Sequence, residues 1–276
     1  VAYYLRLKGY QVTIFEALGV LGGMLRVGIP DYRLPPEVLD QEIDYILSLG
    51  VKTRTGVRFG TDFTFEDLKA EGFTAVFLGI GAHNSLDMGI AGEKDTQGVI
   101  DAVRFLREVN LGNKTCPGSR VVVIGGGNVA IDVALTAKRM GAESVHLFCL
   151  EKRDEMPAHE WEIARAEEEG VLVNNSWWPK KVLGEEKATG LGLIKCSSVF
   201  DKAGNFNPSY DEGITYKIDA NHIILAIGQT ADLGFVNELK GIDTTGGRIA
   251  VEETGLATGE NGVFAGGDVV SGPDSI

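Results

Sequence analysis

The stretch RVVVIGGGNVAIDVALTAKRMGAESVHLFCLEK, residues 120–152, has the order strand, glycine turn, helix, strand and acid. Its loop from Gly125 to Ala130 matches the pattern GxGxxA, in which the first glycine permits a tight turn and the second lets the backbone approach a pyrophosphate. Ala130 keeps the helix close to the sheet, and the helix amino terminus offers N–H groups to phosphates. We expect cofactor contacts at Gly125, Gly127, Asn128 and Ala130.

An acid closes this pattern, since Glu151 lies 21 residues after Ala130. At the end of the second strand a carboxylate accepts the ribose hydroxyls of an adenosine and repels a 2'-phosphate. Glu151 therefore predicts a preference for NADH over NADPH. Lys152 and Arg153 follow directly and are within reach of a 2'-phosphate, so NADP stays open as the alternative cofactor.

The same pattern occurs a second time in VAYYLRLKGYQVTIFEA, residues 1–17, where Glu16 closes a short apolar strand. The repeat indicates two nucleotide folds of the same kind, and by analogy Glu16 is expected to bind an adenosine ribose. By the same spacing, its glycine loop would fall before Val1, so we expect this fold to lack its first strand and loop.

Further contacts to a second cofactor, taken to be FAD, are expected at two places, shortly after Glu16 and near the end of the sequence. Gly22 and Gly23 allow a backbone to lie against a cofactor, and Arg26 and Arg33 add cationic donors. Near the end, GVFAGGDVV at 262–270 places Asp268 after two glycines at a strand end, where a carboxylate accepts a sugar hydroxyl. Taken singly, each of these has an ordinary structural explanation as a turn, a solvated arginine or a strand cap.

The remaining segments alternate between helix and strand, which favours βαβ units in doubly wound sheets. We expect helices at 35–50 and 63–72, a short strand pair at 51–60, and apolar strands broken by glycine at 74–82 and 222–229. Gly228, in the last of these, is another cofactor-binding candidate. Residues 181–219 read as an antiparallel meander, and 247–270 as short strands around glycine turns.

Composition favours a two-domain protein of ordinary solubility. A length of 276 residues exceeds one usual domain, and 37 glycines against 8 prolines suit tight strand-to-helix turns. The net charge of -13 disfavours nucleic acid or an anionic membrane as a partner. The three cysteines, Cys116, Cys149 and Cys196, are too widely spaced for a disulfide framework, so a cytoplasmic location is expected.

Six stretches of the sequence match those of a known family: GGMLRVGIPDYRLP, AVFLGIGAHNSLDMGIAGE, VVVIGGGNVAIDVALTAKRMGA, DEMPA, ILAIGQTAD and GVFAGGDVV. Through them the chain resembles the small (β) subunit of glutamate synthase and related NAD(P)H-dependent flavoprotein oxidoreductases. The resemblance covers essentially the whole length. It implies an α/β fold of two Rossmann-like dinucleotide-binding domains with small antiparallel β segments. The FAD domain would comprise 1–97 and 229–276, with the NAD(P)H domain, 98–228, inserted between them.

The resemblance also implies particular FAD contacts, including a backbone contact to the adenine near Val57. The implied set is Glu16, Gly22, Gly23, Arg26, Arg33, Val57, Gly81, Gly267 and Asp268.

Two departures from the family pattern matter. Paired arginines that usually follow the second strand of the nucleotide domain are replaced by Leu150 and Glu151, which puts NADPH preference in doubt. Members often carry a cysteine-rich iron–sulfur segment ahead of the FAD domain, and none occurs here. Three cysteines cannot ligate a cluster that needs four thiolates.

The function expected is hydride transfer from a nicotinamide to FAD, followed by electron transfer to a partner subunit or iron–sulfur domain. No acid, base or nucleophile is assigned, because His83, His159 and Glu160 form no triad-like arrangement. A disulfide reductase would need a paired CxxC motif, which is missing from the sequence. The alternative from another functional class is a docking subunit that binds no FAD. A third interpretation, a simple NAD dehydrogenase, would leave Glu16 unexplained.

Overall fold

The chain divides into two compact units in the computed structural model, which describes residues 1–113, 117–238, 241–252 and 255–274. The discontinuous unit consists of residues 1–84 and 229–276, and the inserted unit of residues 85–228. The first break expected from the sequence lies between residues 97 and 98. Residues 85–97 group with the inserted unit because Ala91 and Gln97 form β-bridges with Lys181 and Lys187.

The inserted unit begins with a βαβ pattern, continues into an antiparallel sheet and returns to its parallel sheet with the last strand. Its elements are β5 (Val99–Asp101), α5 (Ala102–Asn110), β6 (Arg120–Ile124), α6 (Asn128–Arg139), β7 (Ser144–Phe148), the 3-10 helix η1 (Arg153–Glu155), α7 (Glu160–Glu168), β8 (Val171–Asn174), β9 (Trp177–Leu183), β10 (Gly190–Phe200), β11 (Phe206–Asp219) and β12 (His222–Leu225).

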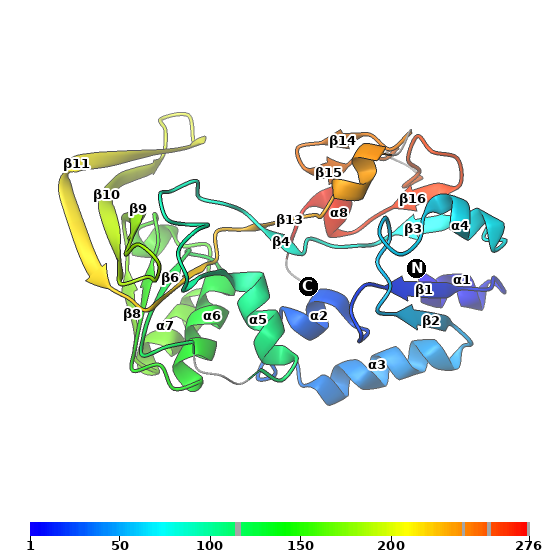
Figure 1. Ribbon diagram of the computed structural model, residues 1–276, viewed down its shortest axis with the longest axis horizontal. Helices are drawn as coiled ribbons and strands as arrows, with labels where there is room; N and C mark the ends of the chain where they lie inside the picture. The colour runs from blue at the N-terminus through cyan, green and yellow to red at the C-terminus, as the bar shows by residue number, and fades with distance from the viewer. Residues whose placement is uncertain (114–116, 239–240, 253–254, 275–276) are drawn as a thin grey trace. The chain divides into compact units, whose positions relative to one another are not determined.

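Five of these strands form one parallel sheet in the order β5-β12-β6-β7-β8. Figure 1 labels β6 and β8 of this sheet and the helices α5, α6 and α7 beside it. From β6 the chain passes through α6 to β7 and β8, and it later returns to the other side of β6 as β12. The strand order therefore reverses at β6, and ligands of open α/β sheets bind at the carboxyl end of strands at such a point.

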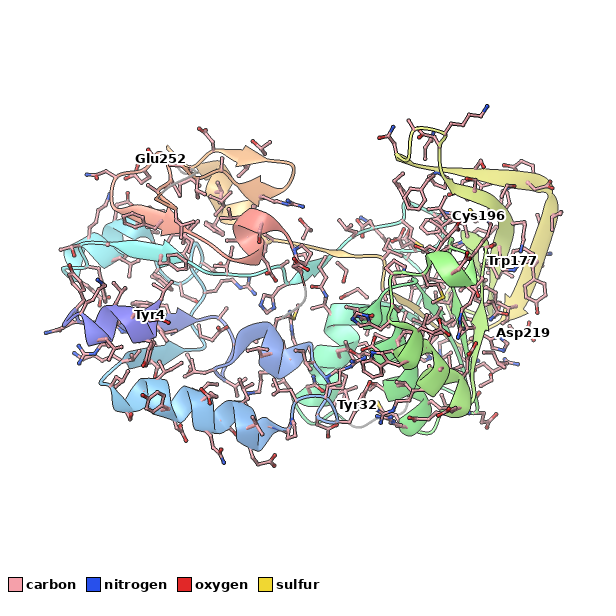
Figure 2. The ribbon with its side chains drawn as sticks, turned by 180° about the vertical axis from the view of Figure 1, so that it is seen from behind. Tyr4, Tyr32, Trp177, Cys196, Asp219 and Glu252 are labelled. Carbon is pink, nitrogen blue, oxygen red and sulfur yellow. The ribbon has the colours of Figure 1, made fainter. Side chains whose placement is uncertain are left out.

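The antiparallel meander expected at 181–219 is confirmed. Strands β9, β10 and β11 pair in the order β11-β10-β9, with β-bulges along β10. The labelled Trp177 and Cys196 mark β9 and β10 in Figure 2. Since β10 pairs on both sides, only β9 and β11 leave strand edges in this sheet.

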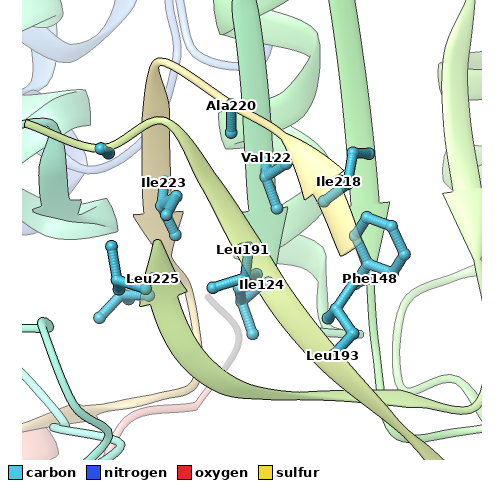
Figure 3. Packing of buried hydrophobic residues seen from close by; sticks show 11 residues of the cluster. Val122, Ile124, Phe148, Leu191, Leu193, Ile218, Ala220, Ile223 and Leu225 are labelled. Carbon is cyan, nitrogen blue, oxygen red and sulfur yellow. The ribbon is translucent and has the colours of Figure 1, made fainter. Parts of the chain in front are cut away.

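The core of the inserted unit lies between its two sheets (Figure 3). Val122 and Ile124 of β6 pack with Leu191 and Leu193 of β10, and all four are at most 1% exposed. Side chains alternate along a strand, so Val121 and Val123 face the opposite side of the parallel sheet, where α6 packs. Both faces of β6 are thus covered, which holds its carboxyl end in place.

The discontinuous unit contains the remaining elements. They are α1 (Ala2–Leu7), β1 (Thr13–Glu16), α2 (Gly23–Val27), α3 (Pro36–Ser48), β2 (Lys52–Thr55), α4 (Phe65–Ala70), β3 (Val76–Leu78), the 3-10 helix η2 (Gly234–Glu238), β14 (Thr244–Thr245), β15 (Arg248–Ile249), β16 (Val263–Ala265) and α8 (Asp268–Ser271). The chain crosses between the units at β4 (Asn84–Ser85) and β13 (Gln229–Thr230), which pair with each other.

Two parallel strand pairs organise this unit, β1 with β2 and β3 with β16. Its core includes Phe65 and Leu68 of α4, Leu78 of β3 and Val263 of β16. Helix α4 starts at a capping box in which the Thr64 hydroxyl and the Asp67 carboxylate satisfy each other's backbone N–H groups. Among the described residues, no helix has the length and hydropathy needed to span a bilayer.

Most secondary-structure expectations for this unit are confirmed, including the helices at 35–50 and 63–72. The strand pair expected at 51–60 is wrong: β2 is one strand, and its partner is the sequence-distant β1. Gly56 ends it with a φ of 71°, where the chain turns away from the sheet. The end of the segment 247–270, expected to form short strands around glycine turns, instead enters the short helix α8 at Asp268.

Candidate functional site

The glycine loop lies where the sequence predicts it, between β6 and α6. Gly125 has a φ of 144°, and a Cβ atom there would lie 2.2 Å from the carbonyl oxygen of Ala226. The same Cβ atom would lie 3.2 Å from the methyl group of Ala130, so both small residues permit the close packing of loop, helix and strand. Gly127 differs, because a Cβ there would meet no heavy atom within 4 Å.

Open space beside Gly127 is what a pyrophosphate requires. Gly127 caps the amino terminus of α6 with extended backbone, and its own carbonyl accepts from the N–H groups of Ala130 and Ile131. The first N–H groups of the helix are left for a ligand, and the helix dipole adds partial positive charge. The loop thus fits the phosphates of a dinucleotide.

Glu151 lies against this loop. A Cβ atom at Gly126 would be 2.6 Å from Glu151 Oε2, so glycine at 126 is what leaves room for the carboxylate. The sequence-based expectation that Glu151 ends the strand is wrong by a few residues, since β7 ends at Phe148. The chain then continues along β8, with the Cys149 N–H donating to the Asn174 carbonyl at 3.2 Å.

Two residues that sequence reasoning missed fix the backbone of Glu151. The N–H of Ser176 and the side-chain amide of Asn175 both donate to the Glu151 carbonyl, at 3.0 and 3.2 Å. Ser176 has a φ of 63°, a left-handed conformation that costs free energy unless its surroundings hold it. The Asn-Asn-Ser sequence at 174–176 was the signal, since such residues favour local turns.

The segment 154–158 (DEMPA) closes on the glycine loop. The Ala158 N–H donates to the Gly126 carbonyl and the His159 N–H to Asn128 Oδ1, both at 3.1 Å. Asn128, expected to contact the cofactor, therefore uses its side-chain oxygen to anchor the start of α7. His159 precedes that helix, and its backbone N–H makes the contact to Asn128.

The remaining candidates of the inserted unit are Lys152, Arg153 and Gly228. Lys152 pairs with Glu155, and Arg153 pairs with Glu160 and Glu167. Gly228 follows β12, with a φ of 121°, and its carbonyl accepts from the Leu86 N–H at 3.1 Å. It lies beyond the carboxyl end of β12, the same edge of the sheet from which the glycine loop emerges.

Cys149 lies beneath the loop, with its Cβ 3.2 Å from a Cβ position at Gly126. Burial, and next the negative charge of Glu151, raise the pKa of its thiol to about 12. Cys149 and Cys196 are both buried and free, and Cys116 lies outside the described residues. A thiol with so high a pKa is a poor nucleophile.

We expect Cys149 to react with iodoacetamide at pH 8 about a thousandfold more slowly in the folded chain than after denaturation in urea. The rate should rise with pH, because the thiolate fraction grows until the pKa near 12 is passed. Since the unfolded thiol ionises near 9 and the folded one near 12, stability should fall as pH rises between these values. Peptide mapping by mass spectrometry measures the labelling, and equal rates in both states would contradict the assignment.

Two FAD candidates of the discontinuous unit lie at the carboxyl ends of β1 and β2. Glu16 ends β1, its Oε1 accepts from the Leu18 N–H at 2.8 Å, and its carbonyl accepts from the Val57 N–H at 3.1 Å. Val57 thus lies in the loop that follows β2, one hydrogen bond away from the backbone of Glu16.

Gly22 and Gly23 begin the short helix α2, with φ of 116° and 52°. A Cβ at Gly22 would be 3.0 Å from Leu39 of α3, while Gly23 faces open space. The Arg26 guanidinium pairs with Asp40 and donates from Nε to the Leu21 carbonyl at 3.0 Å. Arg33 lines a cavity of about 420 Å³, whose other lining residues are Leu25, Ile29, Leu34, Val38, Leu39 and Glu42.

The last FAD candidates follow the parallel strands β3 and β16. Gly81, with a φ of 69°, comes after β3, while Gly267, with a φ of 78°, and Asp268 come after β16. Parallel strands end at one edge, and the Gly266 N–H donates to the Leu78 carbonyl at 3.2 Å, which ties the two loops together. Gly267 faces open space, so this edge also fits a cofactor approaching the backbone.

The described residues contain no group of three or more histidine, cysteine, aspartate or glutamate side chains arranged to hold a metal ion. The chemistry of the donors is instead that of two nucleotide sites: backbone N–H groups beside glycine, and a carboxylate after a parallel strand.

Curated relatives match the whole chain. A beta subunit of NADP(+)-dependent formate dehydrogenase from Moorella thermoacetica is 42% identical, over 100% of this chain and 39% of that protein. A small chain of NADPH glutamate synthase from Halomonas elongata is 34% identical, over 98% and 60%. The PreT subunit of NAD-dependent dihydropyrimidine dehydrogenase from Escherichia coli is also 34% identical, over 98% and 59%. The chain thus spans between 39% and 60% of these relatives.

Solved structures share the fold. FprA from Mycobacterium tuberculosis in complex with NADPH superposes with a TM-score of 0.82 at 16% identity, over 100% of this chain and 77% of that one. Thioredoxin reductase from T. acidophilum gives a TM-score of 0.71 at 18% identity, over 99% and 86%. These neighbours confirm the expected α/β fold of two dinucleotide-binding units.

The sequence matches one protein family over its entire length, from residue 1 to residue 276. The expected resemblance to the glutamate synthase small subunit is confirmed by the relative from Halomonas elongata. Because the match is complete and both units carry the corresponding fold, the chain belongs to the pyridine nucleotide-disulphide oxidoreductase family.

Proposed function

We propose that this chain is the NADH-oxidising, FAD-reducing part of an electron-transfer enzyme. FAD and NAD(P)H are the cofactors of its family. The observation that carries the proposal is the arrangement of the glycine loop and Glu151 at the carboxyl end of β6, where the strand order reverses. When bound, FAD accepts a hydride from the nicotinamide and passes electrons on singly.

The residues of the inserted unit bind and orient the nicotinamide dinucleotide. N–H groups at the start of α6 hold the pyrophosphate, and the Glu151 carboxylate accepts from the adenosine ribose. In the discontinuous unit we assign Glu16, Gly23, Gly81, Gly267 and Asp268 to FAD, because each lies at or after the end of a parallel strand or beside open space. Hydride transfer needs no protein acid or base, and we assign none.

An electron-accepting partner belongs to the proposal. The similar formate dehydrogenase and dihydropyrimidine dehydrogenase proteins are both named as subunits. We propose that this chain likewise delivers electrons to a separate subunit or to an iron–sulfur domain. The free thiols of Cys149 and Cys196 and the need for NADH support a cytoplasmic location.

NADH is the proposed electron donor. The relatives' names divide between NADP and NAD, so the choice for this chain depends on Glu151. A carboxylate beside the ribose repels a 2'-phosphate. We expect kcat/KM to be about tenfold or more in favour of NADH, corresponding to about 1.4 kcal/mol of charge repulsion.

The test is the visible spectrum of the purified chain with added FAD, followed under anaerobic conditions after addition of NADH or NADPH. Flavin bands that bleach faster with NADH support the proposal. Equal rates with both nucleotides would contradict the role of Glu151. A colourless protein that takes up no FAD would instead favour a nucleotide-binding scaffold without flavin chemistry.

A further inference from the structure

Arg153 occupies the position in the sequence from which an arginine can bind the 2'-phosphate of NADP. It follows Glu151 by two residues and begins the 3-10 helix η1. In dinucleotide-binding folds an arginine near the ribose acid is the group that accommodates the 2'-phosphate of NADP. From sequence alone, Arg153 therefore argues against the preference that Glu151 predicts.

The guanidinium of Arg153 is already bound to carboxylates. Nη1 donates to Glu167 Oε1 at 2.7 Å, and Nη2 donates to Glu167 Oε2 at 2.9 Å and to Glu160 Oε1 at 3.0 Å. The contact with Glu167 is bidentate, the strongest geometry for an arginine and a carboxylate. These contacts with Glu167, and next with Glu160, raise the pKa of Arg153 above its usual value.

Both carboxylates belong to α7, and the start of this helix is fastened to the glycine loop. The His159 N–H donates to Asn128 Oδ1 and the Ala158 N–H to the Gly126 carbonyl. Glu160 is the next residue, so it is held beside the loop that receives the dinucleotide. The ion pairs of Arg153 are thus built on the same framework as the nucleotide site.

The neighbouring cation is paired in the same way. Lys152 donates from Nζ to Glu155 Oε1 at 3.3 Å, and its N–H donates to Glu155 Oε2 at 3.2 Å. Each of the two cations after the ribose acid therefore has a carboxylate partner within the protein. A 2'-phosphate that approached Lys152 or Arg153 would therefore have to compete with Glu155, Glu160 and Glu167 for these cations.

We infer that Glu160 and Glu167 are specificity-determining residues: by binding Arg153 they withhold it from a 2'-phosphate and so favour NADH over NADPH. The inference rests on the proposed nucleotide site. Discrimination between NADH and NADPH then has two causes: Glu151 repels the 2'-phosphate, and the carboxylates of α7 bind Arg153. An interpretation in which the ion pairs only fasten η1 to α7 predicts no change in nucleotide choice when they are removed.

Isothermal titration calorimetry with ADP-ribose and 2'-phospho-ADP-ribose tests the inference without a nicotinamide or a flavin. In the chain carrying Glu160→Gln and Glu167→Gln together, the affinity for 2'-phospho-ADP-ribose should rise about tenfold, because a released guanidinium can bind phosphate bidentately. The affinity for ADP-ribose should change by less than about twofold, since that ligand carries no 2'-phosphate.

Two controls separate release of Arg153 from a simple change of charge. Glu168→Gln with Glu143→Gln alters the net charge equally at exposed positions, one of them on α7, and should give no comparable gain. Adding Arg153→Ala to the double variant should abolish the gain. The single variant Glu160→Gln keeps the bidentate contact between Arg153 and Glu167, so its gain in affinity for 2'-phospho-ADP-ribose should be smaller. Because it removes only one ion pair, it also perturbs the fold less than the double variant.

An unchanged affinity for 2'-phospho-ADP-ribose in the double variant would overturn the inference, as would an equal gain in the charge control or in the presence of Arg153→Ala. Those outcomes leave ADP-ribose binding intact. Absence of ADP-ribose binding in the unaltered chain is a different result, because it would overturn the proposed nucleotide site and the inference with it.

Discussion

Replacement of Gly125 by alanine is expected to lower the free energy of unfolding by about 3 kcal/mol or more. The new methyl group would lie 2.2 Å from the carbonyl oxygen of Ala226 and 2.9 Å from its carbon, and a φ of 144° is itself strained for alanine. Both atoms are backbone, and the Ala226 N–H is bonded to the Ile124 carbonyl at 2.7 Å. The clash between the new methyl group and the Ala226 backbone can therefore be relieved only by moving β6 and β12 apart. Urea denaturation followed by circular dichroism measures the loss.

Gly127→Ala is the matched control for that experiment. Gly127 has a φ of -93° and open space around its Cβ position, so alanine should change stability by less than about 0.5 kcal/mol. The methyl group would nevertheless occupy the space in which the pyrophosphate approaches the backbone, and ADP-ribose affinity should fall about tenfold or more. A stable Gly127→Ala chain with unchanged affinity would show that the loop does not hold the phosphates.

The glycine turn between β6 and α6 and the acid Glu16 at the end of β1 were predictable because their signals are local. A tight turn demands glycine, and the interval from loop to acid is one helix and one strand long. The apolar pattern of 121–124 similarly indicates a strand buried on both faces, as found in β6. Such features depend on the backbone geometry of a few consecutive residues.

Contacts between residues far apart in sequence account for what could not be predicted. Residues 51–60 suggest a hairpin, yet β2 finds a better partner in β1, which completes a parallel pair. The segment 85–97 belongs to the inserted unit through its bridges to Lys181 and Lys187. The same applies to Arg153, whose availability to a ligand depends on Glu160 and Glu167 in a later helix.

Exchange of the two ribose acids for glutamine is expected to give opposite results with the two cofactors. Glu151→Gln should weaken NADH binding about tenfold with little effect on FAD, because hydrogen bonds to a charged acceptor contribute about 1.5–3 kcal/mol. Glu16→Gln should weaken FAD binding by a similar factor and leave NADH binding unchanged. Fluorescence titration with NADH and absorbance titration with FAD measure the two affinities.

Glutamine is preferred to alanine because both acids also have structural contacts. The Glu16→Gln side chain would keep an oxygen for the Leu18 N–H, from which Glu16 Oε1 now accepts at 2.8 Å, and the Glu151→Gln side chain would keep the shape that fits against Gly126. A change in binding therefore reports the lost charge. If Glu16→Gln weakened NADH binding and Glu151→Gln weakened FAD binding, the assignment of cofactors to the two units would have to be reversed. If neither affinity changed, neither acid would be a ribose ligand.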